Sequence, residues 1–402
     1  MPKFQYKAKN MAGRIIEGVY EAPSQQAVVE MVRQKSFYLL EIKEIIERKD
    51  IKEMDLFSKI TIKDITIFCK QFAAILRAGV PLIQALHMLT NQTENKLLQN
   101  IIHKISEDIQ KGSSLSMAMS AHGKKIPPIL IHMIHAGEVS GTLENSLEVM
   151  SEHFEKAHKL RQKVKSAMIY PILVCVVAVI VVIFLLTFVV PTFIKLFESS
   201  GTELPFITRM LIAMSGFLKN NFLFILLFTV LLVGGIKFYL SSEKGRLSFD
   251  QAKFRMPLFG ELQTKSIAAN FSRTMSTLMS TGVGITEALN ITSQVLENTY
   301  ARKIMGKIEM QVKEGKGLYV PVRESKLFPV MMENMIMLGE ESGTLENMLS
   351  KTADFFEDEV DEATKRLTTM LEPMIIMVLG IVVAFIVIGI ALPMFDLSKT
   401  VA

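Results

Sequence analysis

Two long stretches without a charged residue divide the chain. The first holds 29 residues between Lys165 and Lys195, and the second holds 23 between Glu372 and Asp396. Because about 20 apolar residues cross the hydrocarbon core of a bilayer as a helix, both stretches predict transmembrane helices. A third apolar stretch, 222–240, is interrupted only by Lys237, whose ammonium can reach the headgroups. The pattern predicts a polytopic membrane protein with three transmembrane helices.

The polar parts of the chain show helical periodicity. Apolar residues recur three and four positions apart in two runs: Ile65, Phe68, Cys69, Phe72 and Leu76, then Phe271, Met275 and Leu278. The runs stop at Gly79 and Gly282, which we interpret as helix-end glycines. About six helices are expected in each polar part. Before them, strand patterns at 4–9, 15–20 and 38–45 with a helix at 24–35 predict a small α/β module. The predicted fold class is therefore mainly α.

An internal repeat explains this order. The hexapeptide at 140–145, Ser-Gly-Thr-Leu-Glu-Asn, reappears unchanged at 342–347, and each copy precedes an apolar stretch. Pro171 answers Pro373 at the start of those stretches, and Pro191 answers Pro393 near their ends. The chain is thus predicted to contain two copies of one unit, a helical bundle followed by a span. The span at 222–240 returns the chain so that both copies share one orientation.

These patterns divide the chain into ten segments. They are an N-terminal α/β module, 1–48; a linker, 49–61; the first helical repeat, 62–168; transmembrane helix 1, 169–190; an extracytoplasmic connection, 191–221; transmembrane helix 2, 222–240; a cytoplasmic linker, 241–264; the second helical repeat, 265–372; transmembrane helix 3, 373–395; and an extracytoplasmic tail, 396–402.

Charge sets the expected orientation. Basic residues gather before the first span and after the second, which predicts cytoplasmic bundles and a cytoplasmic N-terminus; they are Lys156, Lys159, Arg161, Lys163 and Lys165, then Lys237, Lys244, Arg246, Lys253 and Arg255. Three spans then place the C-terminus outside the cytoplasm. The net charge of +5 is concentrated beside the membrane, where membrane lipid explains it better than nucleic acid.

The sequence offers no candidate chemistry. It has no P-loop, no nucleophile motif and no Cys-x-x-Cys. All seven histidines lie between His87 and His158, so the second copy lacks the ligands for a shared metal centre. We therefore expect no catalytic residue, no metal site and no cofactor, and a protein that is not an enzyme.

Three groups of residues are candidate functional positions. Pro171 and Pro373 are interpreted as bends or hinges where a helix enters the membrane. Small residues of the third span, Gly380, Ala384 and Gly389, suggest close packing against another span or subunit. The third group is the repeated corner between helices, formed by Gly137, Glu138 and Gly141 and by Gly339, Glu340, Glu341 and Gly343.

Two interpretations of the corner stay open. In the structural one, glycine supplies left-handed backbone angles and Thr142 caps the helix that follows, with Glu144 in its first turn. In the functional one, Glu138, Glu340 and Glu341 are exposed to meet a basic partner or a cation. An acidic run in the second copy, residues 354–362, is either a solvated helix face or a receiver for a cationic partner.

The duplicated corner, the Gly-Val pairs at Gly79 and Gly282, the paired prolines and the three spans together resemble the type II secretion system protein F family, which includes the type IV pilus inner-membrane platform protein. The resemblance covers essentially the whole chain. It implies a non-enzymatic homo-oligomeric platform in the bacterial inner membrane. Its implied partners are a cytoplasmic hexameric ATPase, pilin or pseudopilin subunits lifted into a filament, and other inner-membrane assembly proteins.

Two rival functions belong to other classes. A membrane-bound signalling scaffold would use the same bundles to hold a regulator. A small-molecule transporter is disfavoured by spans without central polar residues. Whether the filament is a pilus, a secretion pseudopilus or a DNA-uptake fibre is left open by the sequence.

Overall fold

The computed structural model describes residues 3–9, 15–22, 24–34, 37–45, 59–123, 125–193, 205–257 and 259–401. Residues 10–14, where the sequence predicts a turn between the first two strands, lie outside them, as do most of the predicted linker and residues 194–204. Contacts divide the chain into two units. One comprises residues 1–59 with 95–97, and the other comprises residues 60–94 with 98–402.

The N-terminal module is a three-stranded antiparallel sheet with one helix. The sheet has the order β2-β1-β3, and its elements are β1 Lys3–Lys9, β2 Ile15–Glu21, α1 Gln25–Gln34 and β3 Tyr38–Ile45. Phe4 and Ala8 lie on one face of β1, because strand side chains alternate, and they form a core with Val28 and Val32 of α1. The expected α/β module is confirmed.

The first repeat consists of six helices. They are α2 Ile62–Arg77, α3 Leu82–Gln92, α4 Lys96–Gln110, α5 Leu115–Ser120, α6 Pro128–Ser140 and α7 Leu143–Phe184. A capping box starts α2, in which Thr61 Oγ1 accepts from the Asp64 N–H and the Asp64 carboxylate accepts from the Thr61 N–H. The apolar stripe of α2, including Phe68 and Phe72, is buried against α7 and the other helices.

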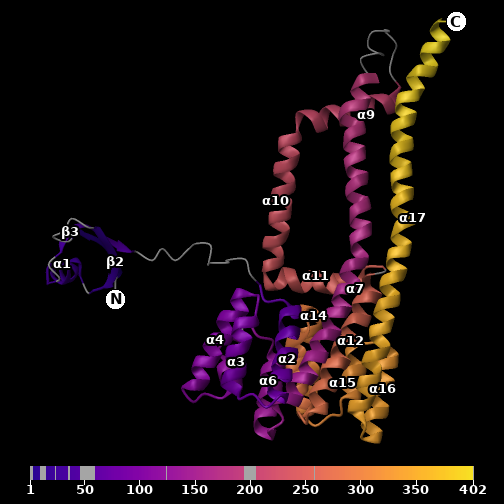
Figure 1. Cartoon of the computed structure of the whole chain (residues 1–402). Coiled ribbons are helices and arrows are strands. Elements are labelled where there is room, and N and C mark those ends of the chain that lie inside the picture. The colour runs from indigo at the N-terminus through magenta and orange to yellow at the C-terminus, as the bar shows by residue number, and fades with distance from the viewer. Residues whose placement is uncertain are drawn as a thin grey trace. The chain divides into compact units, whose positions relative to one another are not determined.

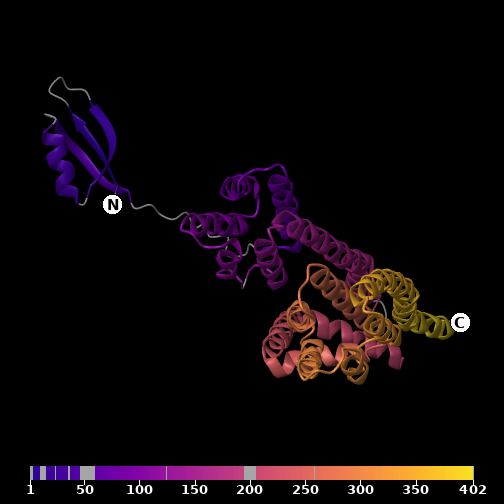
Figure 2. The ribbon, with the colours of Figure 1, turned by 90° about the horizontal axis from the view of Figure 1, so that it is seen from below.

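The second repeat has the same six-helix order. Its helices are α12 Phe259–Ser280, α13 Ile285–Val295, α14 Thr299–Lys313, α15 Tyr319–Ser325, α16 Val330–Ser342 and α17 Leu345–Val401. Phe271, Met275 and Leu278 of α12 are buried as the pattern predicts, and α12 packs along α17 as α2 packs along α7. The two six-helix bundles are confirmed, and Figure 1 and Figure 2 show them beside each other.

Three helices of the described chain are long and apolar enough to cross a membrane. They comprise the segments Leu143–Phe193, Phe222–Ser241 and Leu345–Pro393. The first continues from α7 through the π-helix η1, Leu185–Val189, and the second is α10, Phe222–Ser241. The long helices α7 and α17 run from their bundles into their spans without a break (Figure 1).

Two helices occupy segments that the sequence analysis treats as connections. Before α10, α9 (Phe206–Asn220) packs with η1 and α17 around Leu186, Val190, Leu211 and Ile386. After α10, α11 (Glu243–Arg255) runs crosswise to the spans toward α7 (Figure 1). The polar character of 241–264 concealed α11, and the apolar part of 206–220 is too short to predict a span.

Candidate functional site

The repeated corner has the same backbone geometry in both bundles. Gly141 follows α6 with φ 71°, and Gly343 follows α16 with φ 68°. The N–H of Thr142 donates to the Gly137 carbonyl at 2.9 Å, and the N–H of Thr344 donates to the Gly339 carbonyl at 2.9 Å. Helices commonly end with a residue in the left-handed conformation and a backbone hydrogen bond of this kind. The corner thus stops one helix and aims the next, α7 or α17, along the bundle.

The glycine before each acid allows a close helix approach. A Cβ on Gly137 would lie 2.6 Å from the Ser146 hydroxyl oxygen, and one on Gly339 would lie 2.8 Å from the Leu345 Cα. The expected side-chain cap by Thr142 is wrong. Its hydroxyl lies 2.7 Å from the Ser140 hydroxyl and caps no N–H of α7.

The acids after these glycines face inward. Glu138 accepts from the Leu115 N–H at 2.5 Å and from the Ser116 N–H at 3.0 Å. Glu340 accepts from the N–H groups of Leu318 and Tyr319, the second at 2.8 Å. The expectation that these two carboxylates are left exposed is therefore wrong, because each satisfies the free N–H groups that begin a short helix, α5 or α15.

Glu341 remains as the exposed acid of the second corner. Its counterpart in the first repeat is Val139, whose side chain is 77% exposed. The two corners therefore agree in every position that shapes the backbone and differ in the side chain that each presents outward. A contact between Glu341 and a basic partner stays a prediction.

The acidic face of α17 is occupied by cations of the same chain. Within the second bundle, Arg273 Nε donates to Glu357 at 2.8 Å, its guanidinium also pairs with Asp354, and Lys265 Nζ lies 2.6 Å from Glu359 Oε2. The cationic partner considered for this face is thus internal for these three acids.

Two further cations come from the other repeat. Lys156 Nζ of α7 lies 3.6 Å from Asp354 Oδ1, and Lys163 Nζ lies 3.5 Å from Asp361 Oδ1. The lysines are seven residues apart, as are the aspartates, so each pair keeps one helix face over two turns. That shared spacing is the sequence signal that could have predicted this contact.

The ion pairs shift the acids toward their charged forms. Burial alone would raise the pKa of Asp354, but the neighbouring Arg273 and Lys156 outweigh it and lower that pKa. A hydrogen bond from Lys365 lowers the pKa of Asp361 despite partial burial, and Lys163 adds to the effect. Both aspartates are therefore ionised at neutral pH, the form that pairs with the lysines of α7.

A second contact between the repeats lies around His153. Its ring, 6% exposed, lies 3.4 Å from the Thr277 hydroxyl of α12 and packs edge-on against Phe154. Burial, with the nearby charges of Arg273 and Lys156, lowers its pKa to about 4. His153 is thus a neutral packing residue between α7 and α12.

The two prolines lie within continuous helices, Pro171 in α7 and Pro373 in α17. The residues before them meet, since the Tyr170 hydroxyl donates to Glu372 Oε1 at 3.4 Å. The structure therefore places the two helices side by side where each approaches its span. Their role as hinges stays a prediction.

The helix-end and span glycines take different roles. Gly79 and Gly282 follow α2 and α12 with φ 79° and 83°. In the span of α17, Gly389 contacts α9, whose Thr208 hydroxyl donates to the Gly389 carbonyl at 2.6 Å. Gly380 has open space where a side chain would stand, and Ala384 is exposed. Within the described part of the chain, Gly389 is therefore the one of these three residues that lies against another helix.

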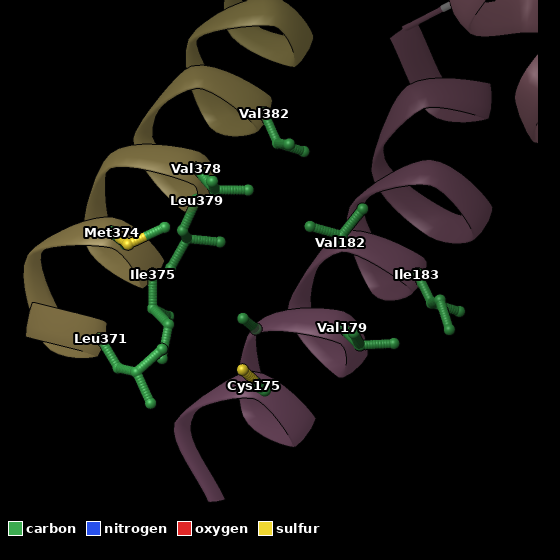
Figure 3. A pocket seen from close by; sticks show the side chains of 11 residues that line it. Cys175, Val179, Val182, Ile183, Leu371, Met374, Ile375, Val378, Leu379 and Val382 are labelled. Atoms are coloured by element: carbon green, nitrogen blue, oxygen red, sulfur yellow. The ribbon is translucent and has the colours of Figure 1, made fainter. Parts of the chain in front are cut away.

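On the bundle side of Gly389, an apolar groove of about 480 Å³ separates the spans of α7 and α17. Figure 3 shows side chains of α7, such as Val179 and Val182, across from Leu379 and Val382 of α17. All eleven lining residues are apolar or sulfur-containing, so the groove suits lipid chains or another apolar helix. Among the described residues, no three His, Cys, Asp or Glu side chains gather to hold a metal.

Comparison with known proteins agrees with this architecture. The family described as Type II secretion system (T2SS), protein F, matches residues 68–191 and again 271–393, which is one match per repeat with its span. The family described as Type II secretion system protein F, N-terminal domain, matches residues 1–43. The matches thus cover the module and both repeats.

Individual relatives match all or nearly all of the chain. The Type IV pilus assembly protein PilC of Thermus thermophilus is 38% identical over 100% of both chains. The protein of the same name from Myxococcus xanthus is 35% identical over 99% of this chain and 96% of its own. The Type II secretion system protein F of Aeromonas hydrophila is 32% identical over 95% of this chain and 99% of its own. The chain belongs to the type II secretion system protein F family of membrane proteins.

Proposed function

We propose that this chain is an inner-membrane platform protein of a type IV pilus or type II secretion machine. In this role it couples a cytoplasmic hexameric assembly ATPase to the extraction of pilin or pseudopilin subunits from the membrane into a filament. The names of the relatives support the assignment to a pilus or secretion machine, and three apolar helices support a location in the membrane. The bundles and the N-terminus lie in the cytoplasm, as the charge bias suggests, and the C-terminus lies outside it.

One observation carries the coupling. The helices α7 and α17 each belong to a bundle at one end and to the membrane at the other, and each runs continuously between the two. They are held to each other by Lys156–Asp354, Lys163–Asp361 and Tyr170–Glu372. A displacement of the bundles therefore moves both spans together, which is what a non-enzymatic transmitter requires.

The prolines give the coupling a place to bend. A proline inside a helix removes one backbone hydrogen bond and weakens that turn. Pro171 and Pro373 lie at the start of the apolar spans, and the residues before them, Tyr170 and Glu372, meet. Bending at the prolines would therefore tilt both spans relative to the bundles. The platform works as a homo-oligomer, together with other inner-membrane assembly proteins.

The test combines copurification with proline variants. The tagged chain is expected to retain an assembly ATPase and a pilin-like protein, and Pro373→Ala is expected to abolish filaments at normal protein level. Pro205→Ala, at the start of α9 and away from both hinges, is the matched control. Normal filament assembly by Pro373→Ala would remove the hinge from the proposal, and copurification of a kinase or regulator instead would favour a signalling scaffold.

A further inference from the structure

Helix α11 lies where the membrane surface should be. The span α10 ends at Ser241, and Ser242 alone separates it from Glu243, the first residue of α11. The Ser242 hydroxyl caps α11 by accepting from the Gly245 N–H at 3.1 Å. A Cβ on Gly245 would lie 2.1 Å from the Tyr239 carbonyl oxygen, so glycine is needed for this abrupt turn. The helix therefore turns from the membrane normal toward the membrane plane (Figure 1).

A groove of about 370 Å³ opens between α11, α12 and α7. Five of its eight lining residues are apolar; they are Val164, Phe249, Met256, Phe259 and Leu262. The aromatic and methionine side chains remain exposed, Phe249 at 43%, Met256 at 46% and Phe259 at 41%. Val164 precedes the charge-free stretch of α7 by two residues, so the groove lies at the boundary of the hydrocarbon region.

Buried polar contacts fix α11, which forms one wall of the groove. Asp250, 4% exposed, accepts from Lys253 Nζ at 2.8 Å and from the Thr299 N–H at 2.8 Å. Asn298 Nδ2 also donates to the Asp250 carbonyl at 3.3 Å. These bonds fix α11 to the start of α14, and the Lys253 ammonium lies 4.9 Å over the Phe249 ring. Phe249 and Met256 thus line the groove from a segment that is hydrogen-bonded to the second bundle.

The surroundings of the groove are basic. Asp250 neutralises Lys253, but Lys244 and Arg255 at the two ends of α11, and Lys165 next to Val164, are exposed and form no ion pair among the described residues. Basic side chains beside an apolar surface attract anionic lipid from the cytoplasmic leaflet. This charge, and continuity with a span, favour a lipid over a protein segment as the occupant.

We propose that the groove between α11, α12 and α7 is a binding site for an anionic phospholipid, which lays an acyl chain against Phe249, Met256 and Phe259 and its headgroup toward Arg255 and Lys165. The bound lipid would hold α11 in the plane of the membrane surface. The site would fix the depth at which the second bundle meets the bilayer.

The chain contains no tryptophan, so a single one reports on the groove alone. Phe259→Trp is introduced into the full-length protein, which is reconstituted in vesicles of phosphatidylcholine with a fraction of brominated lipid. Quenching by brominated phosphatidylglycerol is compared with quenching by brominated phosphatidylcholine. Met256→Trp is a second reporter in case the first perturbs folding, and Phe228→Trp, on the exposed face of α10, reports general lipid contact.

We expect the anionic lipid to quench Phe259→Trp or Met256→Trp at least fivefold more strongly than phosphatidylcholine does, because one surface cation contributes about that factor. At Phe228→Trp the two lipids should quench nearly equally. The double change Lys165→Gln/Arg255→Gln should bring the groove reporter to within twofold of Phe228→Trp. Lys316→Gln/Lys351→Gln, two exposed lysines away from α11, should leave the preference unchanged. Equal quenching by the two lipids at the groove reporters, or no quenching by either, would overturn the proposal.

Discussion

Glu340→Ala is the sharpest test of the corner. The Glu340 carboxylate accepts from two backbone N–H groups, those of Leu318 and Tyr319, at the start of α15. A hydrogen bond to a charged group contributes about 1.5–3 kcal/mol, and partial exposure of Glu340 favours the lower limit for each. Removing both bonds should therefore cost about 3 kcal/mol locally, and alanine adds no helix penalty.

The expected effect is confined to α15. Because 1.4 kcal/mol corresponds to a factor of ten, the amides at the start of α15 should exchange with deuterium about 100-fold faster when the full-length protein is in nanodiscs. Glu341→Ala, the neighbouring exposed acid, is the matched control and should leave exchange unchanged. Equal acceleration by both variants, or none by Glu340→Ala, would refute the assignment of Glu340 to an internal role.

Three further predictions concern the contacts between repeats and the helix ends. Lys163→Glu should loosen α7 from α17, and Lys163→Glu/Asp361→Lys should restore the pairing with a coupling of about 0.5–1 kcal/mol, measured by a double-mutant cycle on thermal unfolding in detergent. His153, with its folded pKa lowered to about 4, binds protons more weakly than in the unfolded chain; stability should fall by about 3 kcal/mol between about pH 6.5 and 4. His153→Phe, which copies Phe355 at the matching repeat position, should remove that fall, as followed by circular dichroism. Gly343→Ala, at a φ of 68°, should cost about 1 kcal/mol through backbone strain, against no loss for Gly306→Ala inside α14, each read from the melting temperature.

The fold was largely predictable because its signals are long and repeated. Charge-free stretches identify spans without any knowledge of tertiary contacts, and apolar positions such as Phe68 and Phe72 identify a buried helix face. The unchanged hexapeptide showed that both bundles share one plan. Helices α9 and α11 were not predicted, because their positions are fixed by neighbours that lie far away in the sequence, such as Leu186, Ile386 and Thr299.

The candidate site was less predictable for the same physical reason. Gly141 and Gly343 predict a left-handed backbone conformation from the local sequence alone, and the structure has that conformation at both positions. The orientation of the Glu138 and Glu340 side chains depends on where α5 and α15 begin, some twenty residues earlier. The local sequence around each acid therefore does not predict it. The pairing of Lys163 with Asp361 depends on how two whole bundles pack, although their seven-residue spacing hinted at it.

The central claim is that this chain is the platform on which a filament is assembled. A clean deletion, followed by shearing of the cells and detection of pilin in the sheared fraction and in the membranes, tests it most directly, with exported proteins assayed in parallel. The account predicts that pilin stays in the membrane with no sheared filament, or that exported proteins fall if the filament is a secretion pseudopilus. Normal filaments together with normal export would contradict it.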